Sequence, residues 1–247
     1  MNEQYIITTS YKFVKIENPE EIRNKLKQIC NENFIKGTIL IASEGINFTI
    51  AGRMENLQIT LQEMRKIHYF SNLEYNNYTT ASFIPFKKMK VRLKKEIVAL
   101  KDSKLNMFET PVGHYLNANE WDELINQKDV IVIDTRNSFE IAFGTFKNAI
   151  DPKTQSFSQL PEWFEKNVNM QDKNQKIAMF CTGGIRCEKS TAYVRSLGFE
   201  NVYHLKGGII KYFEDTQHRE NMWEGNLFIF DDRIALNKKL ESIYQNS

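Results

Sequence analysis

The sequence contains only three cysteines, Cys30, Cys181 and Cys187, among its 247 residues. An odd and low number of cysteines does not build the disulfide framework of small secreted domains. The N-terminus lacks the basic and apolar regions of a secretory signal, and no run of about 18 apolar residues is present to cross a membrane. We therefore expect a protein of the cytoplasm that has no membrane segment.

Residues that would hold a familiar redox cofactor are also scarce, and only four histidines are present. His218 and Glu220 have the local spacing of an iron site built from two histidines and one carboxylate, but no histidine follows them. No G-x-G-x-x-G motif follows an expected strand. The five residues between Cys181 and Cys187 do not match the C-x-x-C spacing of zinc ligands. The sequence therefore identifies no metal site and no cofactor.

Basic residues are concentrated in the N-terminal part, although the net charge of the whole chain is only +2. Residues 1–95 contain 15 Lys and Arg against 9 Asp and Glu, whereas residues 96–247 contain 18 against 22. Positive charge gathered in one part of a chain is typical of proteins that bind a polyanion. We therefore expect a polyanionic partner at the N-terminal part.

The first part of the sequence, residues 1–98, alternates between patterns of strands and helices. Apolar periodicity predicts strands at 5–14, 38–42, 46–50 and within 86–93, and helices at 19–34 and 54–70. The order strand-helix-strand-strand-helix-strand is the ferredoxin-like arrangement, an α+β fold. Ser43-Glu44-Gly45 predicts a hairpin turn between the second and third strands. Polar groups at such a turn are either turn chemistry, the favoured interpretation, or part of a binding site.

The second part of the sequence predicts an α/β domain with a parallel sheet. Polar, turn-rich residues 99–114 predict a linker, and residues 115–219 alternate apolar strands with helices. The strands at 130–133 and 177–180 are continuous apolar runs, as burial on both faces requires. The remaining residues, 220–247, form a C-terminal extension.

A basic strand is expected within 86–95. Strand alternation places four cations on one face, whereas Met89, Val91 and Leu93 face the core; the cations are Lys88, Lys90, Arg92 and Lys94. One interpretation is a ridge that contacts RNA phosphates. The other is a solvated edge strand whose lysines prevent aggregation. The basic bias of the whole N-terminal part favours RNA.

A cysteine loop between an expected strand and an expected helix is the most informative segment of the chain. Cys181 follows the apolar run 177–180, so it lies at a helix N-terminus, where backbone N–H groups and the helix dipole stabilise a thiolate. Arg186 adds a cation. We therefore predict that Cys181 is a reactive thiol and that Arg186 assists it. The rest of the predicted active-site loop is Thr182, Gly183, Gly184, Ile185 and Cys187.

Three charged residues follow another expected strand. Asp134, Arg136 and Glu140 come after the apolar run 130–133, and ligands bind beyond the carboxyl ends of parallel strands. Arg136 and Glu140 could therefore reach the thiol and contact substrate. An ion pair of Asp134 and Arg136 that braces the loop is at least as well supported, and both alternatives remain open.

The other two cysteines carry weaker signals. Cys187 is either a small buried residue in the first turn of its helix, the favoured interpretation, or a resolving thiol that attacks an oxidised Cys181. Two nearby thiols do not by themselves guarantee the geometry for that attack. Cys30 lies on the apolar face of an expected helix and is predicted to belong to the core.

Residues 112–216 resemble a rhodanese domain, on the strength of the Asp134-Thr135-Arg136 motif, the cysteine loop and Leu205-Lys206-Gly207-Gly208. The resemblance implies that Cys181 accepts sulfur as a persulfide. Four residues separate Cys181 from Arg186, one fewer than in the related phosphatase loops, which counts against phosphatase activity.

Essentially the whole chain resembles the tRNA uridine hydroxylase family more closely than it resembles generic rhodaneses. The matching segments are 37–47, 90–98, 178–190, 223–225 and 230–233. The resemblance implies oxygen-dependent formation of 5-hydroxyuridine at wobble position 34 of tRNA, with molecular oxygen as co-substrate and Cys181 required. The chain departs from many members because no cysteine follows Cys187, and because Phe48 stands where glycine is common.

Three functions remain open from the sequence: a tRNA-modifying oxidoreductase, a sulfurtransferase with an RNA or protein acceptor, and an RNA-binding protein with an inactive rhodanese domain. The intact loop argues against the third, and the basic strand argues against a sulfurtransferase that acts on thiosulfate alone. We expect tRNA as the partner. The oligomeric state is not predicted.

Overall fold

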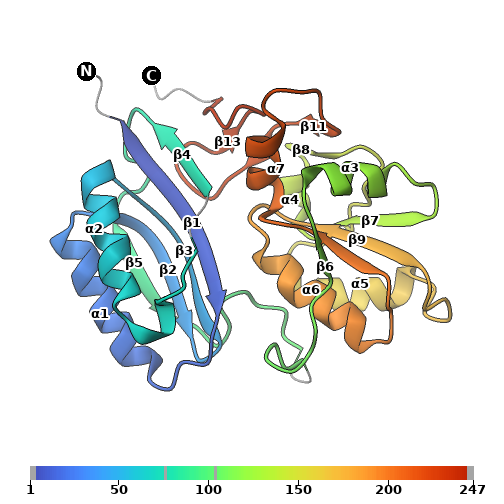
Figure 1. Cartoon of the computed structure of the whole chain (residues 1–247), viewed down its shortest axis with the longest axis horizontal. Coiled ribbons are helices and arrows are strands. Elements are labelled where there is room, and N and C mark those ends of the chain that lie inside the picture. Colours follow the sequence, from blue (N-terminus) through green and yellow to red (C-terminus); the bar gives the residue numbers. More distant parts are fainter. Residues whose placement is uncertain (1–3, 75–76, 103–104, 244–247) are drawn as a thin grey trace. The chain divides into compact units, whose positions relative to one another are not determined.

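The computed structural model describes residues 4–74, 77–102 and 105–243 (Figure 1). Contacts between residues divide the chain into two compact units. Unit 1 is Met1–Val98 with the short segment Asp231–Arg233, and unit 2 is Ala99–Phe230 with Ile234–Ser247. Each unit has its own hydrophobic core.

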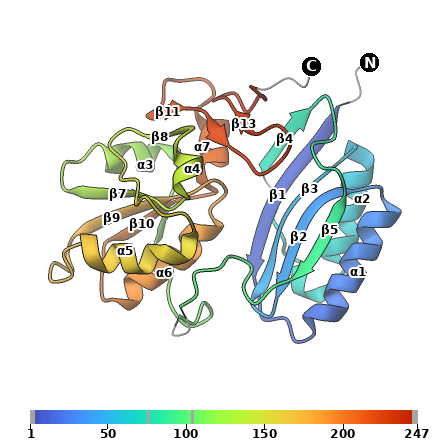
Figure 2. The same cartoon turned by 180° about the vertical axis from the view of Figure 1, so that it is seen from behind.

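Unit 1 is a five-stranded sheet with two helices on one face (Figures 1 and 2). Its elements are β1 (Tyr5–Phe13), α1 (Pro19–Glu32), β2 (Lys36–Ala42), β3 (Gly45–Gly52), α2 (Met54–Arg65), a 3₁₀ turn (His68–Phe70), β4 (Asn77–Ala81) and β5 (Met89–Leu93). The strand order is β4-β1-β3-β2-β5, and only the β2–β5 pair is parallel. The hairpin of β2 and β3 is confirmed.

The position of the basic strand corrects one expectation. β5 is not the fourth strand of the ferredoxin-like motif; that place beside β1 belongs to β4, which the sequence did not predict. β4 reads Asn-Tyr-Thr-Thr-Ala and therefore has no apolar alternation to reveal it. β5 is instead an added edge strand, parallel to β2. The expected helix 54–70 also ends early, at Arg65, because Ile67 is extended and starts the 3₁₀ turn.

The core of unit 1 lies between the sheet and the two helices. α1 contributes Leu26 and Cys30, both fully buried, and α2 contributes Leu61. The predicted core position of Cys30 is confirmed, and burial raises the pKa of its thiol to about 12. Phe48 is 1% exposed, so its large side chain belongs to this core.

The polar residues of the β2–β3 hairpin have a structural role. The carboxylate of Glu44 accepts a hydrogen bond from the Ile97 N–H at 2.6 Å. The Asn47 side chain donates to the Ile97 carbonyl at 3.1 Å. These bonds attach the chain that follows β5 to the hairpin, so the two side chains make long-range contacts here rather than bonds within the turn.

Residues from the C-terminal part complete unit 1. Arg233 and Asp231 form an ion pair at 2.6 Å with both side chains 2% exposed, and Arg233 also donates to the Thr79 hydroxyl at 2.8 Å. The Asp232 N–H donates to the Pro85 carbonyl. A buried arginine that is paired in this way avoids the cost of an uncompensated charge. Residues predicted as a C-terminal extension thus pack against the N-terminal sheet.

Unit 2 is built on a parallel sheet in the order β6-β10-β9-β7, with α3 and α7 on one face and α5 and α6 on the other (Figure 1). Its main elements are β6 (His114–Leu116), α3 (Ala118–Ile125), β7 (Val130–Asp134), α4 (Ser138–Ile141), α5 (Leu160–Asn167), β9 (Lys176–Phe180), α6 (Ile185–Ser196), β10 (Val202–Leu205) and α7 (Gly208–Thr216). A 3₁₀ turn spans Phe157–Gln159, and four short strands complete the unit: β8 (Gly144–Phe146), β11 (Trp223–Gly225), β12 (Leu227–Phe228) and β13 (Ala235–Leu236).

Aromatic rings fill the core on the α3 and α7 side of this sheet. Phe146 packs edge-to-face against Phe180, Tyr212 and Trp223, with ring centroids 4.8 to 5.2 Å apart. Such geometry adds to the free energy of burial because a positive ring edge meets a negative ring face. Within the described ranges, no helix combines the length and apolarity that a membrane span requires.

Candidate active site

The cysteine loop lies between β9 and α6, as the sequence predicted for this segment. Cys181 directly follows the last residue of β9, and α6 begins at Ile185 after Gly184, whose φ of +96° suits glycine. The Gly184 N–H donates to the Cys181 Sγ at 3.2 Å. The sulfur therefore lies at the N-terminus of α6, and Cys181 is only 1% exposed.

The surroundings of Cys181 favour its thiolate. Burial alone would raise the pKa of this thiol, but a hydrogen bond from the Cys187 side chain, the charge of Arg186 and the backbone N–H groups of Cys187 and Arg186 outweigh burial. Together they lower the pKa of Cys181 to about 6. At neutral pH the sulfur is therefore mostly ionised, and the thiolate is the reactive form of cysteine.

Arg186 is held in place by Glu140. Its guanidinium donates to both carboxylate oxygens of Glu140, at 2.6 and 2.7 Å, in a two-point ion pair. A further contact of 3.4 Å reaches the Thr182 hydroxyl in the loop. Burial acts to lower the pKa of Arg186, but the Glu140 carboxylate and the Cys181 thiolate outweigh it and raise that pKa. The cation beside the sulfur is thus permanent and oriented.

Arg136 is placed differently from Arg186. Its guanidinium donates to both oxygens of Asp134, at 2.9 and 2.6 Å, and to the Gly144 carbonyl, and it stacks 5.1 Å above the Trp223 ring. Both Asp134 and Arg136 are fully buried. The pair therefore braces the chain after β7. The Arg136 side chain is bound to Asp134 and does not extend to the thiol.

The chain after β10 supports the loop from the other side. The Ile209 N–H donates to the Cys181 carbonyl at 3.0 Å, and the Ile210 N–H donates to the Thr182 carbonyl at 3.1 Å. A Cβ on Gly208, whose φ is +68°, would lie 2.6 Å from both of these carbonyl oxygens. The sequence showed the glycine pair after a strand but not its contact with the cysteine loop, because that contact joins residues 26 or more positions apart.

Cys187 is fully buried and close to Thr135. The Thr135 hydroxyl donates to the Phe180 carbonyl at 2.9 Å and lies 3.8 Å from the Cys187 Sγ. Burial, and then the neighbouring Cys181, raise the pKa of Cys187. Cys187 is therefore protonated at neutral pH and offers a hydrogen to its neighbours.

Two of the four predicted RNA-binding cations, Lys90 and Arg92, lie on β5 of unit 1, whereas Lys88 comes just before this strand and Lys94 just after it. All four are exposed. Met89 and Val91 pack against the core, as predicted. The prediction for Leu93 is wrong, since it is 42% exposed. Leu93 is the last residue of β5, at the end of the strand.

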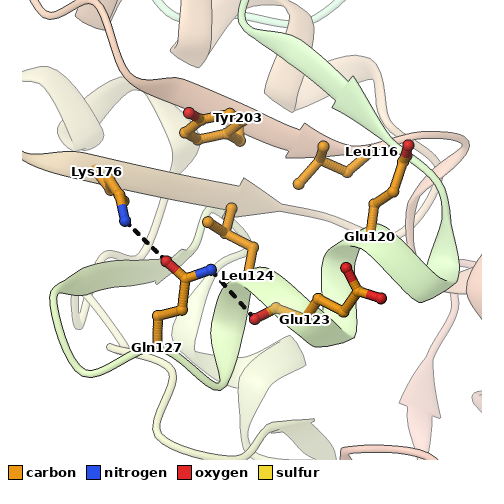
Figure 3. Close-up of a pocket in the computed structure, with 7 residues that line it drawn as sticks. All are labelled: Leu116, Glu120, Glu123, Leu124, Gln127, Lys176 and Tyr203. Atoms are coloured by element: carbon orange, nitrogen blue, oxygen red, sulfur yellow. Dashed lines mark hydrogen bonds between the residues drawn. The ribbon is translucent and has the colours of Figure 1, made fainter.

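No metal-binding cluster of three or more His, Cys, Asp or Glu side chains is found among residues 4–74, 77–102 and 105–243. A shallow pocket of about 250 Å³ in unit 2 is lined by Leu116, Glu120, Glu123, Leu124, Gln127, Lys176 and Tyr203 (Figure 3). Lys176 is the first residue of β9, whereas Cys181 follows its last. At about 3.3 Å per residue the two lie about 16 Å apart, so this pocket is separate from the thiol.

Comparison with known proteins agrees with this architecture. Residues 5–97 match a family model described as the UPF0176 acylphosphatase-like domain, and residues 117–215 match the rhodanese-like domain. The predicted fold class, an α+β ferredoxin-like domain followed by an α/β rhodanese domain with a parallel sheet, is thereby confirmed.

Two curated relatives are similar over nearly their whole length. The protein named tRNA uridine(34) hydroxylase from Rickettsia conorii is 47% identical over 244 residues, which cover 98% of this chain and 97% of the relative. The protein of the same name from Rickettsia bellii is 48% identical over 239 residues, which cover 96% and 94%. On this similarity, the chain belongs to the tRNA uridine(34) hydroxylase family.

Proposed function

We propose that this protein hydroxylates C5 of uridine 34 in tRNA and that Cys181 acts at the reacting base. The family relationship supports the reaction, since relatives with 47% and 48% identity carry the name of that activity. The observation that carries the role of Cys181 is its pKa, which is lowered to about 6. An ionised thiol at a helix N-terminus is a nucleophile, and it can therefore act on an electrophilic ring such as the uracil base.

The loop residues have distinct roles in this proposal. Arg186 stabilises the negative charge on Cys181 and on groups that form beside it, and Glu140 positions Arg186. Thr182, Gly183, Gly184 and Ile185 shape the cradle around the sulfur, and Cys187 supplies a hydrogen bond to it. Asp134 and Arg136 hold the adjacent chain without contacting substrate.

Molecular oxygen is the proposed co-substrate: one oxygen atom enters the C5–OH group, and the other is reduced to water with two protons and two electrons from an external two-electron reductant. The basic strand of unit 1 is the proposed tRNA contact, since exposed Lys and Arg side chains neutralise backbone phosphates and release their counterions. With tRNA as substrate, the proposed location is the cytoplasm.

The test is nucleoside mass spectrometry of tRNA from cells that lack this protein, complemented with wild type, Cys181→Ala or Cys30→Ala. We expect 5-hydroxyuridine and nucleosides derived from it to vanish in the deletion and to return with wild type and Cys30→Ala only. Restoration by Cys181→Ala would refute the role of the thiol.

A sulfurtransferase is the second candidate, because a lowered cysteine pKa in a rhodanese-type loop also suits persulfide formation. The same experiment separates the two. Unchanged 5-hydroxyuridine together with loss of a thiolated nucleoside would replace hydroxylation by sulfur transfer.

A further inference from the structure

Four phenylalanines of unit 2 form a cluster on its surface. Phe139 of α4 and Phe143 just after it meet Phe228 of β12 and the nearby Phe230. Ring centroids lie 5.3 Å apart for Phe139 and Phe228, 5.1 Å for Phe228 and Phe230, 6.2 Å for Phe139 and Phe230, and 5.3 Å for Phe143 and Phe228. We call these residues the phenylalanine cluster.

Two rings of the phenylalanine cluster are far more exposed than the side chains of a hydrophobic core. Phe230 is 65% exposed and Phe139 is 43% exposed, although both rings pack against Phe228. The rings of Phe139, Phe228 and Phe230 are mutually perpendicular, at 88° for each pair. Three perpendicular rings form a corner, in which a flat ligand that stacks on one ring meets another ring at its edge.

The cluster borders the cysteine loop through α4. Phe139 directly precedes Glu140, whose carboxylate binds the Arg186 side chain at 2.6 Å. On the other side, the Asn226 N–H donates to the Phe143 carbonyl at 2.7 Å and holds the chain that leads to Phe228 against α4. The rings therefore lie at the carboxyl edge of the parallel sheet, where Cys181 also lies.

Exposed cations accompany the rings at this edge. Lys153 pairs with Asp151 at 2.8 Å, and Asp151 also accepts a hydrogen bond from Ser138, the residue before Phe139. The Lys153 side chain is 82% exposed, so this pair is weak and remains open to a phosphate. Lys206 is exposed at the carboxyl end of β10.

Aromatic faces with nearby cations match the chemistry of unpaired RNA. Proteins that read single-stranded loops stack splayed bases on aromatic side chains and contact the backbone with Lys and Arg. An enzyme that acts on one base must also draw that base out of its stack, which leaves the neighbouring bases without a partner. A corner of rings at the same sheet edge as the reactive thiol is placed to receive such a neighbour.

We propose that the phenylalanine cluster stacks on a nucleobase adjacent to the uridine that is presented to Cys181. The inference rests on the proposed function, because it takes the substrate to be an unpaired loop of tRNA. The cluster is a binding site that is separate from the basic strand and contacts bases rather than phosphates alone.

The test is a double-mutant cycle between protein and RNA. The affinity of an anticodon stem-loop is measured by fluorescence anisotropy for wild type and for the double variant Phe139→Leu and Phe230→Leu, which keeps apolar bulk but removes the rings. Each stem-loop carries either all bases or an abasic site on one side of uridine 34. Phe108→Leu is the matched control, because Phe108 is also in unit 2 and is 52% exposed.

We expect the double variant to bind the intact stem-loop about tenfold more weakly, the lower part of the range for loss of one stacked base. For one of the abasic stem-loops, wild type should bind about tenfold more weakly than it binds the intact stem-loop. The double variant should bind that abasic stem-loop and the intact stem-loop with equal affinity. Phe230→Tyr together with Phe139→Tyr should retain wild-type affinity. Equal losses in all proteins, or unchanged affinity in the double variant, would overturn the proposal.

Two further measurements separate this proposal from the proposed function. The rate of Cys181 alkylation by iodoacetamide should be the same in wild type and in the leucine variants, which shows that the loop is intact. If wild type hydroxylates the stem-loop but shows no coupling in the cycle, stacking is refuted and hydroxylation stands. If coupling is present but the stem-loop is not hydroxylated, stacking stands and the proposed hydroxylation is refuted. A cluster that instead binds a protein would show no coupling to any base.

Discussion

The Arg186 guanidinium and the Glu140 carboxylate are joined by two hydrogen bonds of 2.6 and 2.7 Å, although 46 residues separate them in the chain. Glu140 comes from the short helix after β7, and Arg186 comes from the first turn of α6. The pair therefore ties two neighbouring strand ends together and fixes the cation beside the reactive sulfur. The Glu140 side chain is 0% exposed and the Arg186 side chain is 10% exposed, so water does not replace either partner.

Glu140→Ala should destabilise the protein strongly, because it leaves Arg186 buried without its partner. The expected loss is about 3 to 5 kcal/mol in the free energy of unfolding, measured by urea denaturation at pH 7. Glu162→Ala is the control, since its pair with Lys166 has both side chains about 70% exposed and should have little measurable effect. Equal stability of the two variants would contradict the role assigned to the pair.

The contribution of Glu140 should also depend on pH. Burial acts to raise the pKa of Glu140, but the charge of Arg186 and its hydrogen bonds outweigh burial and lower that pKa below its usual value of 4.5. A lowered pKa in the fold means that the stabilisation is complete above pH 4.5 and is lost as pH falls through the folded value. The stability difference between wild type and Glu140→Gln should therefore shrink on acidification below pH 4.5.

Cys181 should react as a thiolate at a lower pH than an ordinary cysteine. The rate of iodoacetamide modification, followed by mass spectrometry of the Cys181 peptide, should rise with a midpoint near pH 6. Arg186→Met removes the cation and should move that midpoint toward 9, the usual value for a cysteine. A midpoint that stays near 6 in this variant would show that Arg186 does not stabilise the thiolate.

The lowered pKa of Cys181 also predicts a pH effect on folding. Between about pH 6 and pH 9 the unfolded chain keeps the Cys181 proton that the folded chain has lost, so stability from this group rises with pH in this window. The stability advantage of wild type over Cys181→Ser should thus be greater at pH 8 than at pH 6, as measured by urea denaturation. A constant difference would mean that the folded pKa is not lowered.

Gly208→Ala should displace the cysteine loop. Its Cβ would lie 2.6 Å from the carbonyl oxygens of Cys181 and Thr182, which are fixed by the first N–H groups of α7. Gly198→Ala is a matched control, because Gly198 also has a positive φ, +92°, but its Cβ would come no closer than 3.8 Å to another side chain. The control bears only the strain of the backbone, about 1 kcal/mol.

We expect Gly208→Ala to lose stability by clearly more than Gly198→Ala and to change the rate of Cys181 alkylation, which Gly198→Ala leaves intact. Matching effects of the two substitutions on both measurements would show that backbone strain alone, and not the contact with the loop, accounts for the role of Gly208.

Replacing Lys90 and Arg92 together by Glu should weaken tRNA binding through lost phosphate contacts. The slope of log affinity against log salt concentration should fall by about 1 for each contact removed. Lys27→Glu, an exposed lysine on α1, is the control and should change neither quantity much. An unchanged salt slope in the double variant would assign these cations to protection of the edge strand instead.

Local patterns were enough to predict those parts of the molecule whose chemistry is local. The strand, glycine-rich loop and helix around Cys181 follow from an apolar run, two glycines and a helix start, all within about 15 residues. The edge strand with alternating cations follows from the period of two that side chains have in a strand. The match to the family extended these patterns to the whole chain and to its fold class.

Tertiary structure decided which charged groups meet. From the sequence, Arg136 could either reach the thiol or pair with Asp134, and Glu140 could reach the thiol. In the structure Arg136 pairs with Asp134, and Glu140 pairs with Arg186. Likewise, β4 carries no apolar alternation and exists because β1 leaves an edge to pair with. The contact of Gly208 with the loop and the meeting of Phe139 with Phe230 join distant segments. Pairing, burial and close approach depend on the packed chain, and no local pattern records them.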